Sequence, residues 1–160
     1  PIGKAHILNY GDDITIVAMS YMNTEAIRSL DYLDSKGISS ELIDLRSVNP
    51  IDWITIFNSV RKTGRLLVLD TGSETGSLAA EIIAKVSSEL FADLISAPKR
   101  VCLPDVPVPA SFALTKDFYP TSYDIAKKVC AMLEVSFNEK DFKRSSFPHD
   151  VPGDWFKGPF

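Results

Sequence analysis

The stretch whose residue types could do chemistry is Arg65 to Leu78, RLLVLDTGSETGSL. Its apolar run ends in an acid, Asp70, and a polar segment with glycines at positions 72 and 76 precedes a helical pattern. This order predicts a strand, a loop and a helix in a parallel sheet, where ligands usually bind at the carboxyl ends of the strands. A helix amino terminus at such a place could attract an anion.

The same loop lacks the features of a phosphate site. The sequence contains neither G-x-x-x-x-G-K-[ST] nor G-x-G-x-x-G, the two glycine-rich motifs that cradle phosphates. The carboxylates of Asp70 and Glu74 would repel a phosphate. We therefore predict that residues 70–77 form a tight structural turn that lets the following helix approach the sheet.

Two further segments were candidates for phosphate or magnesium chemistry. Asp12 and Asp13 form an acidic pair, but they precede the apolar run ITIVAM, whereas the magnesium-binding acids of response regulators follow such a strand. The segment 20–24, SYMNT, contains no glycine, which argues against a flavodoxin phosphate loop. We predict that the acidic pair forms the turn of a hairpin.

The remaining nucleophiles and bases are isolated. His6 and His149 have no cysteine or serine partner by motif. Cys102 and Cys130 show no metal-ligand spacing and are expected to be buried thiols. We expect no catalytic, cofactor-binding or metal-ligating residue in this chain.

Length and composition narrow the class of protein. The 160 residues suit one domain with a real core, and the net charge of −4 argues against non-specific nucleic-acid binding. No apolar run approaches the roughly 20 residues of a membrane-spanning helix. The cysteine usage indicates a reduced compartment. Because the chain begins at Pro1 without Met, we expect a processed product or a fragment, in which a targeting signal is not readable.

Alternating strands and helices organise the chain. Strands are expected at residues 4–9, 14–19, 39–45, 65–70 and 99–102, and helices near 23–36, 52–64, 77–90 and 121–133. Repeated alternation predicts parallel pairing with right-handed crossovers, hence an α/β domain. The short connection Tyr10–Asp13 instead predicts an antiparallel hairpin, which puts the first strand at or near an edge.

The last third of the chain differs in character. Leu103–Ala110, LPDVPVPA, carries three prolines and cannot be a central strand. Thr121 and Asp124 have the spacing of a capping box. From Val135 the periodicity ends and aromatic residues accumulate, so we predict that this extension packs along its own domain or a neighbouring chain.

Several segments together resemble a known family. They are PIGKAHI, DDITIVAMSYM, GISSELIDLRSVNPID, VRKTGRLLVLD, GSLAAEI and VCLPDVPVP. From about Pro1 to Leu133 the chain resembles the C-terminal domain of transketolase-like enzymes, and within them the beta chain of thiamine-diphosphate-dependent 2-oxoacid dehydrogenases of the pyruvate or branched-chain type. The most specific pieces are Ile43-Asp44-Leu45-Arg46 with Pro50 and Asp52, Lys62-Thr63-Gly64-Arg65, and Asp105-Val106-Pro107-Val108-Pro109.

The resemblance implies a three-layer α/β domain over residues 1–134, with a five-stranded, mostly parallel sheet and one antiparallel edge strand. Residues 135–160 are then a C-terminal extension. It also implies that thiamine diphosphate and magnesium bind in other domains of the parent enzyme, one of which supplies a Gly-Asp-Gly motif that this sequence lacks. The implied partners are an alpha chain or other domains of the same enzyme, a second beta chain, and a dihydrolipoyl acyltransferase.

On this interpretation the chain belongs to an enzyme of the cytoplasm or the mitochondrial matrix. The chain alone is inactive and serves assembly and docking. The candidate docking residues, chosen from the predicted loops and the extension, are Asp105, Lys116, Asp117, Tyr123, Asp124 and Phe160. Two other interpretations stay open: the C-terminal domain of a transketolase or deoxyxylulose-phosphate synthase, and a stand-alone flavodoxin-like binding module.

Overall fold

The computed structural model describes residues 1–115 and 118–143. Its strands are β1 (His6–Asn9), β2 (Ile14–Ala18), β3 (Ser40–Asp44), β4 (Leu66–Ser73) and β5 (Lys99–Leu103). Its helices are α1 (Met22–Ser35), α2 (Trp53–Thr63), α3 (Leu78–Glu89), α4 (Phe112–Thr115) and α5 (Ser122–Met132), with short 3₁₀ turns η1 (Phe91–Asp93) and η2 (Glu139–Asp141).

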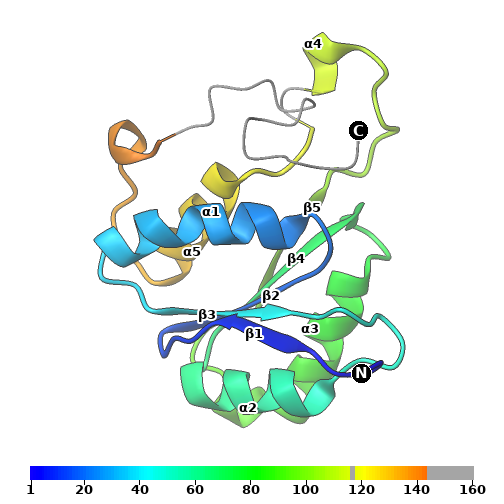
Figure 1. Cartoon of the computed structure of the whole chain (residues 1–160), viewed down its shortest axis with the longest axis vertical. Coiled ribbons are helices and arrows are strands. Elements are labelled where there is room, and N and C mark those ends of the chain that lie inside the picture. Colours follow the sequence, from blue (N-terminus) through cyan, green and yellow to red (C-terminus); the bar gives the residue numbers. More distant parts are fainter. Residues whose placement is uncertain (116–117, 144–160) are drawn as a thin grey trace.

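The sheet is the middle of three layers. Its five strands run in the order β1-β3-β2-β4-β5, and only β1 is antiparallel to its neighbour. Helices α1 and α5 cover one face, and α2 and α3 cover the other (Figure 1). The expected five-stranded, mostly parallel α/β architecture is therefore confirmed.

Strand β2 shows why the sheet needs helices on both faces. All five of its residues have no exposed surface. Ile14 and Ile16 pack into the core beneath α1 and α5, whereas Val17 packs into the core beneath α2 and α3. An unbroken apolar run is the sequence signature of such a doubly covered strand.

The prediction of a hairpin between β1 and β2 was wrong. β1 does lie at an edge, but it pairs antiparallel with β3, with His6 opposite Asp44, and β3 separates it from β2. The connection passes closely over the start of β3, because a Cβ added to Gly11 would lie 2.3 Å from the carbonyl carbon of Ser40. Two strand spacings are about 10 Å, which four extended residues can span at about 3.3 Å each.

The helix boundaries follow the expected capping residues. Asp52 accepts a hydrogen bond from the amide of Thr55 at the start of α2, and Ser77 accepts one from Ala80 at the start of α3. The capping box of Thr121 and Asp124 opens α5. The proline-rich segment after β5 contains no strand, as predicted.

The first part of the C-terminal extension packs on its own domain. Phe137 and Phe142 have ring centroids 5.2 Å from that of Tyr32 on α1. Both also make edge-to-face contacts with Tyr123 on α5. Residues 135–143 thus close the core beneath α1 and α5, and the remaining aromatic residues of the extension, 147–160, lie outside the described residues.

Candidate docking surface

The carboxyl ends of the four parallel strands form one edge of the domain, hereafter the carboxyl edge, on the right of Figure 1. The connections that follow β2, β3, β4 and β5 lie here. Because β1 runs antiparallel to β3, the residues before it also reach this edge, where Gly3 donates its amide to the Ser47 hydroxyl at 2.9 Å. This is the edge where sheets of this kind bind ligands.

Asp70 follows the apolar run of β4, and its carboxylate accepts hydrogen bonds from backbone amides. It is 6% exposed, and its two carboxylate oxygens accept hydrogen bonds from the amides of Gly72 at 2.9 Å and Ala79 at 3.1 Å. It thereby fixes the turn and the first turn of α3. Residues 70–77 are the structural turn that the sequence predicted, although β4 itself continues to Ser73.

Asp105 joins two loops of the carboxyl edge. Its carboxylate accepts hydrogen bonds from the side chain of Thr75 at 2.5 Å and from the Thr75 amide at 2.9 Å. The Thr75 side chain, followed by the Thr75 amide, lowers the pKa of Asp105. The carboxylate therefore stays charged at neutral pH and ties the proline-rich segment to the β4–α3 loop.

Of the other expected docking residues, two make contacts within the domain and three lie outside the described residues. Asp124 accepts hydrogen bonds at 2.8 Å from the amide and hydroxyl of Thr121, and Tyr123 packs among the aromatic rings of the extension. Lys116, Asp117 and Phe160 lie outside the described residues. Among the described candidates, Asp105 bridges two loops of the carboxyl edge, whereas Tyr123 and Asp124 lie in the first turn of α5.

Exposed apolar side chains at this edge were missed by the sequence reasoning. The exposed fractions are 86% for Ile2, 45% for Tyr21, 59% for Val48, 56% for Val106 and 63% for Val108. They come from four separate connections. The alternation of valine with proline in LPDVPVPA was the available signal, since an extended segment without strand partners cannot bury its side chains on both sides.

Tyr21 is held in place although much of its ring is exposed. Its hydroxyl donates to Glu25 at 2.8 Å, and burial of the hydroxyl followed by this hydrogen bond raises the pKa of Tyr21 to about 12. Glu25 is itself 4% exposed and accepts from the Ser122 amide at 2.8 Å. The exposed ring is therefore fixed to both α1 and α5.

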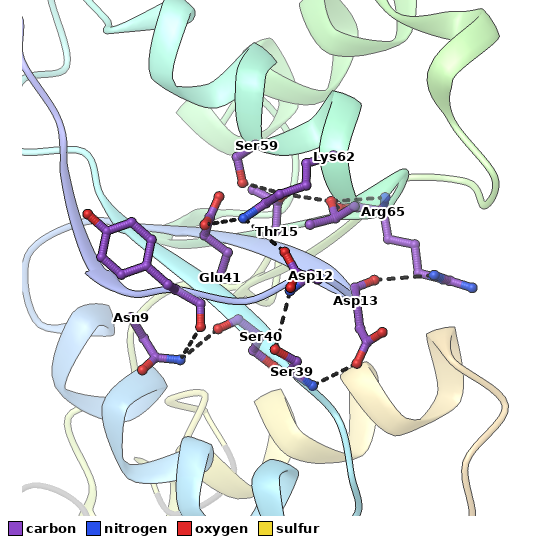
Figure 2. Close-up of polar contacts among 12 residues, drawn as sticks. Asn9, Asp12, Asp13, Thr15, Ser39, Ser40, Glu41, Ser59, Lys62 and Arg65 are labelled. Atoms are coloured by element: carbon purple, nitrogen blue, oxygen red, sulfur yellow. Dashed lines mark hydrogen bonds and ion pairs between the residues drawn. The ribbon is translucent and has the colours of Figure 1, made fainter.

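The opposite edge of the sheet, the amino edge, carries a polar cluster that the sequence did not reveal (Figure 2). Lys62 donates to Glu41 at 2.6 Å and lies 3.3 Å from a carboxylate oxygen of Asp12. Burial lowers the pKa of Lys62, but Glu41 and Asp12 outweigh that effect and raise it. Glu41 is only 3% exposed, so this ion pair is structural.

The acidic pair lies at this amino edge. The Asp13 carboxylate accepts from the Ser39 amide at 2.8 Å, and the Asp13 carbonyl accepts from Arg65 at 3.2 Å. Figure 2 shows the Asp12 carboxylate near Lys62 of α2 and the Asp13 carboxylate near Ser39, just before β3. The two acids hold in place a connection that passes over β3, so the prediction that they form a hairpin turn was wrong.

The described residues offer little for catalysis. Within 1–115 and 118–143, no three His, Cys, Asp or Glu side chains come together so that they could hold a metal ion. Burial raises the pKa of both the Cys102 and Cys130 thiols, which makes them poor nucleophiles at neutral pH. Among the described helices, none is long and apolar enough to cross a membrane.

A family model described as the C-terminal domain of transketolase matches residues 3–125. The chain belongs to this transketolase C-terminal domain family. A solved structure described as "Split gene transketolase, inactive beta4 tetramer" superposes with a TM-score of 0.73 at 27% identity, covering 84% of this chain and 44% of that one. Asp44, Asp52 and Lys62, which lie in the sequence pieces that carried the resemblance, each make a structural hydrogen bond.

Two curated relatives are beta subunits. The chain is 41% identical over 134 residues to the "Pyruvate dehydrogenase E1 component subunit beta" of Rickettsia bellii, covering 81% of this chain and 41% of the relative. It is 36% identical over 126 residues to the "Acetoin:2,6-dichlorophenolindophenol oxidoreductase subunit beta" of Cupriavidus necator, covering 79% and 37%. The chain thus spans about two fifths of the length of these relatives. These matches confirm the resemblance to beta chains of 2-oxoacid dehydrogenases.

Proposed function

We propose that this chain is the C-terminal assembly and docking domain of the beta chain of a thiamine-diphosphate-dependent 2-oxoacid dehydrogenase. The parent enzyme would decarboxylate a 2-oxoacid and pass the acyl group to a lipoyl arm. The observation that carries the proposal is the set of exposed apolar side chains at the carboxyl edge of a family domain. Apolar side chains gathered at one edge indicate a surface that a partner covers.

The chemistry would take place in other domains of the parent enzyme. The described residues do not fit magnesium and a diphosphate, because both oxygens of the best-placed acid, Asp70, already accept backbone amides. No metal-ligating cluster occurs in the described ranges. We therefore assign thiamine diphosphate and magnesium to the rest of the parent enzyme, and this chain alone is proposed to be inactive.

The partners proposed are a second beta chain, an alpha chain or other domains of the enzyme, and a dihydrolipoyl acyltransferase. Val106 and Val108 would supply contact area, and Asp105 would set the position of their segment through Thr75. The 41% identity to a pyruvate dehydrogenase beta subunit, against 27% to a split-gene transketolase, favours this proposal over a transketolase role. Lys116, Asp117 and Phe160 stay predictions.

Self-association of the 160-residue chain tests the assembly role. Size-exclusion chromatography with light scattering should show that the chain associates as its concentration increases. The double variant Val106→Asp, Val108→Asp should remove this association. The matched control is Phe91→Asp, because Phe91 is 80% exposed in η1, in the connection that leads to the start of β5 at the opposite edge of the sheet. A chain that stays monomeric throughout, or one whose association only the control removes, contradicts self-assembly through this edge.

Calorimetry with thiamine diphosphate and magnesium tests the assignment of the cofactor to other domains. We expect no heat of binding to the isolated chain, because the acids of its carboxyl edge are already used by backbone amides. Binding at micromolar concentration would overturn that assignment without bearing on the association experiment. The two tests therefore separate the docking role from the missing cofactor site.

A further inference from the structure

A pocket of about 550 Å³ opens along the outer edge of β5 and includes Glu74 and Pro104 from the connections of the carboxyl edge. β5 is the last strand of the sheet, so its outer side has no strand partner among the described residues. Strand β5, helix α5 and the segment 118–120 line the pocket. Its volume is in the range of pockets that hold small organic ligands, about 300–1,000 Å³.

The charged side chains of this pocket are mainly basic, although the whole chain has a net charge of −4. Arg100 comes from β5, and Lys127 and Lys128 come from α5. Two acids also line the pocket. One of them, Asp124, is engaged with Thr121 at the start of α5, which leaves Glu74 as the acid that faces the three cations.

Arg100 is held loosely by the protein. Its Nε atom is buried and has no hydrogen-bond partner among the described residues. The nearest carboxylate is that of Glu74 at 3.7 Å from Nε, and the Glu74 side chain is 62% exposed. This separation is too long for a hydrogen bond. A buried guanidinium nitrogen without an acceptor costs free energy, and an anionic ligand would remove that cost.

Aromatic and proline side chains also line the pocket and form its aromatic wall. Tyr119 is 36% exposed, whereas Phe118 is 6% exposed and supports the Tyr119 ring edge to face, with ring centroids 5.0 Å apart. Pro104 and Pro120 add apolar surface. A ring system can stack on the Tyr119 ring while an attached anion reaches the basic side.

We propose that this pocket binds a phosphate monoester that carries a flat ring, as a nucleoside monophosphate does. The phosphate accepts from Arg100 with Lys127 and Lys128 around it, and the ring lies against Tyr119. Planar, doubly donating recognition is what an arginine offers a phosphate. The proposal is separate from the assembly role, because none of the exposed apolar side chains assigned to docking lines the pocket.

Binding of adenosine 5′-monophosphate to the full 160-residue chain tests the proposal. Titration calorimetry at low ionic strength should show binding that weakens as salt is added. Arg100→Gln should weaken it about tenfold, equivalent to 1.4 kcal/mol. Glu74→Gln should strengthen it about threefold, since the competing carboxylate is gone. Arg61→Gln is the matched control, because Arg61 is likewise loosely paired, 3.8 Å from Asp93 on the far side of the domain.

Adenosine and inorganic phosphate separate the two halves of the ligand. Each alone should bind at least about tenfold more weakly than the monophosphate if both walls contribute. Equal binding of phosphate alone would show that the aromatic wall has no part, and the proposal would be wrong. It would also be overturned if adenosine monophosphate did not bind at all, or if Arg61→Gln weakened binding as much as Arg100→Gln. The opposite effects expected of Arg100→Gln and Glu74→Gln distinguish loss of a contact from loss of folding.

Discussion

The two edges of the same sheet use their polar residues differently. At the amino edge, side chains pair with one another: Lys62 with Glu41, and Thr15 with Ser59 and Thr63 at 2.7 and 2.8 Å. At the carboxyl edge, acids such as Asp70 hold the backbone of loops, and apolar side chains face outward. The amino edge therefore joins its elements through side-chain pairs, whereas the carboxyl edge uses its acids to hold loop backbone.

The largest difference in stability between the two edges is expected for a substitution at Gly11, in the β1–β2 connection at the amino edge. Gly11→Ala should lower the free energy of unfolding by about 3 kcal/mol, because the added Cβ meets backbone that cannot move aside. Gly76→Ala at the carboxyl edge should cost about 1 kcal/mol, since the added Cβ has open space and only the positive φ of 76° opposes it. Urea unfolding of both variants measures the difference. Equal losses would mean that the close passage over β3 is not tight.

The next effect is at the buried ion pair of the amino edge. Lys62→Met should lower the free energy of unfolding by about 2 kcal/mol, because it leaves the buried Glu41 carboxylate unpaired. The loss is smaller than for a fully buried pair, since the Lys62 side chain is 39% exposed. Asp12→Asn is the control, with a loss below about 0.5 kcal/mol for a side chain that is 79% exposed. If Asp12→Asn lowered the free energy of unfolding more than Lys62→Met, the exposed pair of Lys62 with Asp12 would be the stabilising one.

Alkaline pH should weaken the amino edge selectively. The pKa of Lys62 is raised in the folded state above its ordinary value of 10.5. Its contribution is therefore fully present below that value and is lost as the pH rises through the folded-state pKa. Comparison of wild type with Lys62→Met in urea at pH 9 and pH 11 should show the two free energies of unfolding converging. If the difference between the two free energies of unfolding were the same at pH 9 and pH 11, Lys62 would not be the cause of the loss of stability at alkaline pH.

Acid should weaken the carboxyl edge instead. Burial opposes ionisation of Asp52, but hydrogen bonds from the Thr55 side chain, the Ala5 amide and the Thr55 amide outweigh it and lower its pKa below the ordinary 3.8. Its contribution is present above that value and is lost as the pH falls through the folded-state pKa. Asp52→Asn keeps a helix-capping side chain but should lose less stability than wild type between pH 5 and pH 3. An identical decline would exclude Asp52 as the cause.

The smallest expected effect is at the exposed valines of the carboxyl edge. Val106→Asp alone should change the free energy of unfolding by less than about 0.5 kcal/mol, because Val106 is 56% exposed and packs little. The same urea experiment measures it. A loss comparable to that of Lys62→Met would show that the proline-rich segment stabilises the domain and would remove the contrast between the two edges.

Local rules predicted the elements well. The buried strand around Ile16, the caps at Asp52 and Ser77, and the capping box at Thr121 all depend on residues within a few positions of one another. The turn that Asp70 organises was also expected, because its glycines and acids lie side by side in the sequence. These features follow from short-range geometry, which a single sequence contains.

Long-range choices could not be predicted in the same way. The four residues between β1 and β2 can connect two strands that are adjacent or two strands that have a third between them. The length of this connection therefore could not show whether β1 pairs with β2 or with β3. The pair of Lys62 with Glu41 joins residues 21 positions apart, and nothing in either segment marks them as neighbours. The exposed apolar side chains likewise come from connections that only the strand order brings to one edge.

The aromatic contacts of Phe137 and Phe142 have a consequence for the order in which the chain is made. Tyr32 belongs to an early helix, yet two of the rings that cover it are synthesised more than a hundred positions later. On the ribosome, α1 therefore waits with an uncovered ring until residue 142 has left the exit tunnel. The packing around Tyr32 can therefore be completed only after residues 137–142 have been synthesised.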